Sequence, residues 1–237
     1  MRGVATDRGV ALESIAADVP FAITDHDIEG LKIIPTERPQ AVSTEGRFRM
    51  ANGSASLPAN LAVQFGFSTP GRTPDSIPAD GGAFWLRSTP GTFSVLPVAP
   101  PGYAVTELRY GGLNYTNCLI PMNGAPGASF DIVLSDQPAT ISGSLVDGEQ
   151  KPIPAKVALV PDPLPQGFDW RAIRVAVTDK DGGFGFTGIA PGRYKAVALT
   201  GDERKQDHDL SLLGDKFRVV DAFEVTTGQN ARITVKP

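Results

Sequence analysis

The sequence predicts an all-β protein of two tandem β-sandwiches with about seven strands each, preceded by a strand segment from a truncated third repeat. Three observations carry this prediction. Glycine (26) and proline (21) are abundant, as expected for many short strands separated by turns. Short runs of alternating apolar and polar residues recur about every 8–12 residues. Finally, one turn–strand–turn–strand phrase occurs twice in the chain.

The repeated phrase occupies Thr178–Val197 and, one domain earlier, Asp80–Leu96. Its Asp-Gly-Gly turn supplies residues that tolerate positive φ, and its Pro-Gly pair forms a second turn before the next strand. Three pairs of equivalent residues lie 101 positions apart: Asp80 and Asp181, Gly91 and Gly192, and Phe93 and Tyr194. The constant spacing predicts a duplicated unit of about 100 residues.

The same spacing of 101 aligns the aromatic residues of one copy with positions in the other. It puts Ala83 and Trp85 where Phe184 and Phe186 stand. Because alternate residues of a strand share one face, we expect the rings at these positions to fill the sandwich cores.

The domain boundaries follow from the repeat. Residues 36–135 form the first sandwich and residues 137–237 the second. Residues 1–35 form a partial repeat with a closing strand near 28–34, because Leu31, Ile132 and Ile233 are again 101 positions apart. We therefore expect the chain to belong to a longer one.

Within this frame the strands are expected in order along the chain. The first sandwich should contain strands near 41–50, 57–63, 92–98, 114–121 and 130–135, and the second near 141–146, 153–160, 171–178, 217–225 and 231–235. In the stretch 171–178, alternation predicts that Ile173, Val175 and Val177 point inward. Cys118 lies in the strand-like stretch 114–121, where a buried and inert thiol is expected.

Composition excludes several classes of function. The net charge is −4 and no cluster of lysine and arginine occurs, so the phosphate contacts of a nucleic-acid-binding protein are not expected. No apolar run is long enough to cross a bilayer, and no signal peptide is visible behind Arg2. The single cysteine cannot form an internal disulfide.

The motifs identify a family resemblance. Domain two carries a Thr-Asp-x-Asp-Gly-x-Phe turn (178–184) and a Pro-Gly-x-Tyr turn (191–194), and its Pro154, Val157 and Leu159 match a Pro-x-x-Val-x-Leu strand. This pattern resembles carboxypeptidase regulatory-like domains, which have a transthyretin-like (prealbumin-like) sandwich. It is also similar to the carbohydrate-binding-like fold and to the Ig-like B-type repeats of bacterial adhesins. Domain one keeps the Asp-Gly and Pro-Gly pairs but has Phe93 in place of the tyrosine.

The resemblance implies a non-catalytic interaction or spacer module of a bacterial secreted or envelope protein, with a protein or polysaccharide as partner. Two alternatives stay open: a carbohydrate-binding module, and an accessory domain of a larger peptidase whose catalytic domain is absent here. A ligand site is expected at Phe168, Trp170 and Arg171, where aromatic faces adjoin polar groups. Trp170 has a second interpretation, as a residue that caps the sandwich.

No enzyme, cofactor or metal site is predicted. His26 and Glu29 have the His-x-x-Glu spacing of zinc peptidases but lack a third ligand, so a solvated turn is expected there. Asp80, Asp179 and Asp181 offer too few oxygens for Ca²⁺ and are interpreted as hairpin-turn residues. No nucleophile–base pair for acyl transfer occurs in a recognisable motif.

Overall fold

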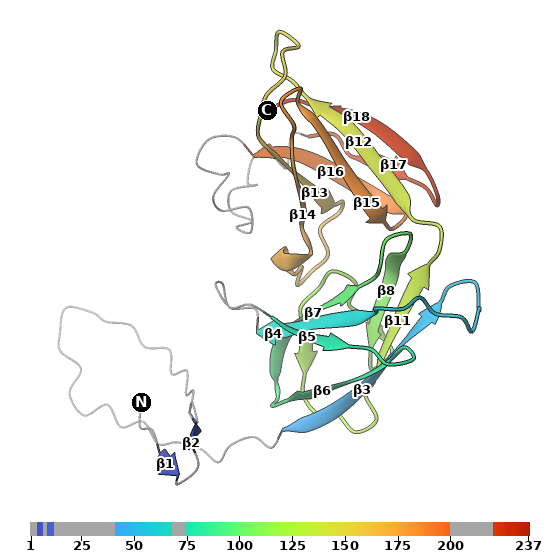
Figure 1. Cartoon of the computed structure of the whole chain (residues 1–237), viewed down its shortest axis with the longest axis vertical. Coiled ribbons are helices and arrows are strands. Elements are labelled where there is room, and N and C mark those ends of the chain that lie inside the picture. The colour runs from blue at the N-terminus through green and yellow to red at the C-terminus, as the bar shows by residue number, and fades with distance from the viewer. Residues whose placement is uncertain (1–3, 7–8, 12–40, 68–73, 200–219) are drawn as a thin grey trace, which may run out of the picture. The chain divides into compact units, whose positions relative to one another are not determined.

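The structure, a computed structural model, describes residues 4–6, 9–11, 41–67, 74–199 and 220–237 (Figure 1). These residues form β-strands, turns and one short 3-10 helix, η1 (Trp170–Ala172), which confirms the predicted all-β class. No helix among the described residues has the length and apolar character needed to cross a membrane. Contacts divide the chain into two units, Met1–Gln40 and Ala41–Pro237.

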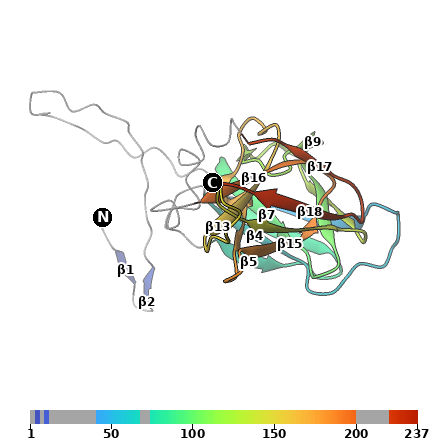
Figure 2. The ribbon, with the colours of Figure 1, turned by 90° about the horizontal axis from the view of Figure 1, so that it is seen from above.

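The first unit contains one described hairpin. Strands β1 (Val4–Thr6) and β2 (Gly9–Ala11) pair antiparallel, with Val4 opposite Ala11 (Figure 2). The closing strand expected near 28–34 lies outside the described residues, and so do His26 and Glu29.

The second unit begins with two sheets that face one another. Their strands are β3 (Val42–Met50), β4 (Ala62–Phe67), β5 (Asp75–Pro78), β6 (Ala83–Ser88), β7 (Gly91–Val98), β8 (Ala104–Tyr110), β9 (Leu113–Asn114), β10 (Ile120–Met122) and β11 (Phe130–Ser135). One sheet has the order β10-β7-β4-β5 and the other β6-β3-β11-β8-β9. Strand β11 pairs parallel with β3 and antiparallel with β8.

Two further sheets follow in the same unit. Their strands are β12 (Ala139–Leu145), β13 (Lys156–Pro161), β14 (Arg174–Val177), β15 (Gly183–Ile189), β16 (Gly192–Leu199), β17 (Phe223–Val225) and β18 (Asn230–Val235). They form the orders β15-β12-β18 and β14-β13-β16-β17. Strand β12 pairs parallel with β18, as β3 does with β11.

The strand pairing of the two sandwiches corresponds except at β8 and β9. The order β10-β7-β4-β5 matches β17-β16-β13-β14, and β6-β3-β11 matches β15-β12-β18. Among the described residues the first sandwich has nine strands and the second seven, because β8 and the two-residue β9 extend one sheet of the first. The shared topology agrees with the repeated sequence phrase.

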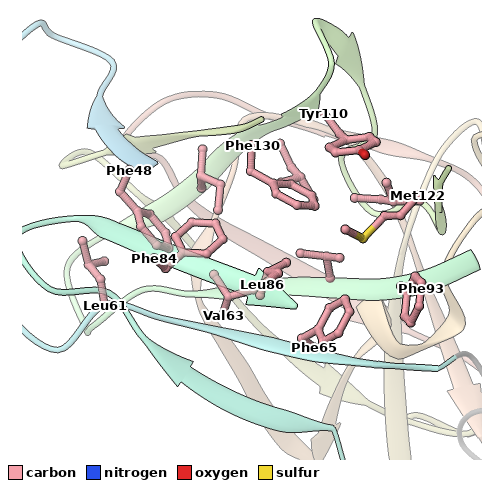
Figure 3. Close-up of a cluster of buried hydrophobic side chains, with 14 of the residues drawn as sticks. Phe48, Leu61, Val63, Phe65, Phe84, Leu86, Phe93, Tyr110, Met122 and Phe130 are labelled. Carbon is pink, nitrogen blue, oxygen red and sulfur yellow. The ribbon is translucent and has the colours of Figure 1, made fainter. Parts of the chain in front are cut away.

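Aromatic side chains from both sheets fill the first core (Figure 3). The ring centroids of Phe48 and Phe84 are 5.7 Å apart, those of Phe84 and Phe130 6.0 Å, and those of Phe130 and Tyr110 4.8 Å. Burying one such ring contributes about 1.5–3 kcal/mol. The alternation of β3 agrees with this packing, because every second residue of the strand from Thr44 to Met50 is buried.

The predicted orientation of strand β6 is wrong. Trp85 is 62% exposed, whereas the adjacent Phe84 is 2% exposed and lies in the core. Gly46 faces Phe84 across the β3–β6 pair, just as Gly143 faces Phe184 across β12–β15. Phe84 is therefore equivalent to Phe184, at a spacing of 100 instead of 101. A slip of one residue turns every side chain of a strand to the other face.

The second sandwich buries both faces of strands β13 and β16. Val157, Leu159, Ala196 and Ala198 belong to the core between the sheets. Their neighbours form a second cluster on the opposite face, composed of Ala158, Val160, Ile173, Val197 and Leu199. Such double burial explains why β13 reads as a continuous apolar run.

Strand β14 corrects one detail of the prediction. Ile173, just before the strand, is buried and Val175 packs against the second cluster, but Val177 is 72% exposed. Strand β14 is an edge of its sheet, and Val177 lies at its end opposite Lys156. Alternation fixes the face of Val177, whereas its burial depends on what covers that end.

Candidate functional site

The predicted ligand residues lie on the loop between β13 and β14, and this loop contacts the first sandwich. The amide of Leu119 donates to the carbonyl of Gly167, and the amide of Asp169 donates to the carbonyl of Asn117, each at 2.8 Å. Between these bonds Cys118 and Phe168 form an antiparallel bridge. We call residues 117–119 and 167–169, together with Ser94 of β7, the joint.

A buried carboxylate stands at the centre of the joint. Asp169 is 0% exposed. One carboxylate oxygen accepts the amide of Arg171 at 3.0 Å, which caps helix η1, and the other accepts the hydroxyl of Ser94. A buried carboxylate is stable only when hydrogen bonds replace its lost water. Asp169 therefore ties the loop of the second sandwich to strand β7 of the first.

The structure places Phe168, Trp170 and Arg171 together, all half-buried, on either side of Asp169. Phe168 packs against the second cluster of the second sandwich. The guanidinium carbon of Arg171 lies 5.3 Å from the centroid of the Trp170 ring, within the range of a cation–π interaction. These three side chains thus combine packing with one cationic group, and the ligand site expected there stays a prediction.

A cleft of about 720 Å³ opens beside the joint. Its walls come mainly from β7 and β8 of the first sandwich and from η1, β14, β15 and β16 of the second. Arg171, Arg174 and Arg193 are the charged residues of its described lining, which contains no aspartate or glutamate. The volume lies within the range of small-molecule sites, roughly 300–1,000 Å³.

Cys118 lies in a turn of the joint, and the prediction that it belongs to a strand is wrong apart from its one bridge to Phe168. Its thiol is half-buried and donates to the carbonyl oxygen of Thr116 at 3.5 Å. Burial raises the pKa of the Cys118 thiol, and the negative charge of Asp169 raises it further. The thiol is therefore protonated at neutral pH and is a poor nucleophile.

The carboxylate of Asp179 in the repeated phrase accepts hydrogen bonds from the backbone of its own turn. One oxygen of Asp179 accepts the amides of Asp181 at 2.9 Å and Gly183 at 2.7 Å. The hydroxyl of Thr178 accepts the amide of Ala155 at 2.8 Å and so attaches the turn to the start of β13. Within the described ranges, no three His, Cys, Asp or Glu side chains gather as a group able to hold a metal ion.

Sequence reasoning missed Asp169 and Ser94 as partners. In the sequence Ser94 alternates with Phe93 and Val95 and so is expected to face outward, whereas the structure buries all three residues in one run. A serine inside such a run needs a hydrogen-bond partner, although its identity depends on the fold.

No protein-family model matches the chain, and no curated protein matches it. Solved structures of Gram-positive pilins are similar to it. A streptococcal ancillary pilin is 15% identical, with 91% of this chain and 68% of the pilin covered and a TM-score of 0.30. The minor pilin GBS52 of Streptococcus agalactiae is 11% identical, with 82% and 94% covered and a TM-score of 0.31.

The Bacillus anthracis TIE protein is also similar, at 14% identity and a TM-score of 0.30. The alignment covers 83% of this chain and 34% of that protein, so this chain spans about a third of its length. Likeness at this level carries no statement about function or ligands.

Proposed function

We propose that the chain is a non-catalytic spacer and interaction module of a bacterial secreted or envelope protein. Its domains would be 36–135 and 137–237, with 1–35 as the end of a preceding repeat. The joint is the observation that supports this proposal. A buried Asp169 and two backbone hydrogen bonds hold the loop of one sandwich against the other, in addition to the short linker near residue 136.

A second close approach supports a stiff connection. Gly188 of β15 adopts a φ of +67°, and a Cβ built there would lie 3.1 Å from the carbonyl oxygen of Tyr103. The sandwiches therefore approach each other at two separate places, at the joint and at Gly188, in addition to the linker. A module of this kind holds the neighbouring parts of a longer protein at a fixed distance.

Nuclear spin relaxation of backbone amides tests the spacer role. We expect residues 41–135 and 137–237 to tumble with one common rotational diffusion tensor, and an Asp169→Asn variant to separate them. Two independent correlation times in the unmodified protein would contradict a spacer. The envelope assignment is tested by labelling intact cells of the source organism with an antibody against the second sandwich. Labelling that requires lysed cells would contradict it.

The second candidate function is carbohydrate binding at the loop of Phe168, Trp170 and Arg171. The observation that favours it is the cleft beside this loop, because Arg171 lines the cleft together with tyrosines and hydroxyl-bearing side chains. The carboxypeptidase regulatory-like assignment belongs to this proposal as well, since it rests on the sequence motifs. A glycan array probed with the full chain tests carbohydrate binding.

A further inference from the structure

The charged side chains that line the cleft are all positive. Its described residues contain three arginines, Arg171, Arg174 and Arg193, and no acidic side chain, although the whole chain has a net charge of −4. Burial raises the pKa of the Tyr194 phenol, so this residue adds no negative charge at neutral pH. Its hydroxyl donates to the carbonyl of Ala190 at 2.8 Å.

Each arginine is held in position by a contact of its own. The guanidinium of Arg171 lies beside the Trp170 ring. One nitrogen of Arg174 donates to the carbonyl of Thr187 at 2.9 Å. Arg193 bonds to Asp162 at 3.2 Å. A guanidinium has five N–H donors, so a single contact fixes its orientation and leaves Arg174 with donors for a ligand.

Two described carboxylates contact arginines of the cleft, and both already accept hydrogen bonds or ion pairs. Asp162 is shared between Arg193 and Lys195, whose nitrogens lie 3.2 Å and 3.7 Å from its two oxygens. Asp169 is buried and accepts hydrogen bonds from Ser94 and from the amide of Arg171. These carboxylates lie outside the lining, so arginines are the only ionised side chains among its described residues.

The remaining lining combines tyrosine rings with hydroxyl and amide groups. Tyr103 and Tyr194 contribute rings, while Thr106, Asn117 and Gln64 contribute groups that both donate and accept hydrogen bonds. A mixture of ring surface and two-way polar groups suits a molecule with many hydroxyls. The guanidinium groups suit carboxylates, which they can bind with two parallel hydrogen bonds.

From this combination we infer that the cleft binds a short acidic oligosaccharide, with the sugar carboxylates on Arg171, Arg174 and Arg193. The inference rests on the second candidate function, carbohydrate binding, and is independent of the spacer role. It differs from the sequence-based site in that Arg174 and Arg193 take part, whereas Phe168 packs against the second cluster of the second sandwich.

Calorimetry on the full chain tests this inference with four probes: an oligogalacturonate, a malto-oligosaccharide of the same length, a polyglutamate peptide and inorganic phosphate. We expect saturable binding of the oligogalacturonate alone, weakening as salt is added. In a Trp85→Phe variant the other tryptophan, Trp170, becomes the only one, and its fluorescence should change with the same binding curve. Binding without that change would overturn the location.

Matched variants identify the cationic groups. Arg174→Gln should weaken oligogalacturonate binding about tenfold or more, as loss of a charge-assisted contact implies. Arg87→Gln, on the exposed face of β6, should leave binding unchanged. If Arg174→Gln fails to fold, Arg193→Gln replaces it, since that side chain is 62% exposed. Equal affinity of the cleft and control variants would overturn the inference.

The probes also separate this inference from carbohydrate binding in general. Equal or tighter binding of the malto-oligosaccharide would overturn the acidic specificity and leave carbohydrate binding intact. Binding of polyglutamate or phosphate in place of sugar would overturn both. Absence of binding to any probe would overturn the inference, while the glycan array decides carbohydrate binding and the relaxation experiment decides the spacer role.

Discussion

Gly143 on β12 lies directly opposite Phe184 on β15, and the phenylalanine ring occupies the space in which a side chain would stand. A Cβ at Gly143 would lie 2.4 Å from the ring and 2.6 Å from the carbonyl oxygen of Ile233. The first sandwich repeats this pair, since a Cβ at Gly46 would lie 2.1 Å from the ring of Phe84. The glycine–phenylalanine contact is therefore a shared packing feature of both sandwiches.

Replacing Gly143 tests this contact. A Gly143→Ala variant should lower the free energy of unfolding by about 1–3 kcal/mol, because the ring and a backbone carbonyl would both have to move. Gly148→Ala is the control: a Cβ there meets nothing within 4 Å. Urea denaturation measures both variants. Equal stability of the two variants would show that β12 and β15 accommodate the added methyl group without strain.

Neighbouring residues of β6 should differ sharply in their effect. Phe84→Ala removes a core ring and should lower the unfolding free energy by about 3–5 kcal/mol. Trp85→Ala removes an exposed side chain and should change it by about 0.5 kcal/mol or less. Thermal unfolding followed by circular dichroism compares them. A larger loss of unfolding free energy for Trp85→Ala than for Phe84→Ala would support the orientation predicted from the sequence.

Substitutions of Ser94 and Asp169 should have coupled effects on stability, because the two side chains share a hydrogen bond. Ser94→Ala leaves a buried carboxylate with one donor fewer, which should destabilise the protein by about 1–3 kcal/mol. Ser43→Ala, on the exposed face of β3, is the matched control and should be nearly neutral. A double-mutant cycle with Asp169→Asn measures the coupling. Additive effects would mean that the two side chains act independently.

Alkylation of Cys118 should depend on pH in a way that reports the joint. Because burial and Asp169 raise the thiol pKa, the rate should have its midpoint above the ordinary value of about 8.5. Below that midpoint the protonated thiol reacts slowly. Asp169→Asn removes the negative charge and should shift the midpoint to lower pH. Mass spectrometry follows the single cysteine directly, and a midpoint below about 8.5 in the unmodified protein would contradict the proposed environment.

Local chemistry was enough to predict most strands and turns, but the strand expected near 57–63 begins only at Ala62 and the stretch 114–121 holds only the ends of β9 and β10. The run 41–50 became β3 because alternate residues share a face, and the Asp179 turn formed where glycines and carboxylates allow tight bends. Equivalent strands of the two sandwiches pair in the same order, in agreement with the duplicated phrase.

The register of β6 could not be predicted from spacing alone. Two alignments of the repeat conflict at this strand. The Asp-Gly-Gly turns align Asp80 with Asp181, 101 positions apart, whereas the cross-strand contacts align Phe84 with Phe184, 100 positions apart. Only pairing with Gly46 decides between them, and that pairing joins residues distant in sequence. Spacing therefore indicated the repeat but not which aromatic ring is buried.

The joint was equally beyond sequence reasoning. Its hydrogen bonds connect residues 117–119 with 167–169, and neither segment forms a strand, although the stretch 114–121 was expected to be one. Asp169 was visible between two aromatic residues, but its partner Ser94 lies 75 residues away. The arginines of the cleft come from η1, β14 and β16, so they gather only in the folded chain.

Strand β7 carries Phe93 in the core of the first sandwich and, one residue later, the hydroxyl that reaches Asp169 of the second. When the first sandwich unfolds, the buried carboxylate of Asp169 therefore loses its hydrogen bond from Ser94 at the same time. Scanning calorimetry should accordingly record a single cooperative transition for residues 41–237, and Ser94→Ala should split it into two.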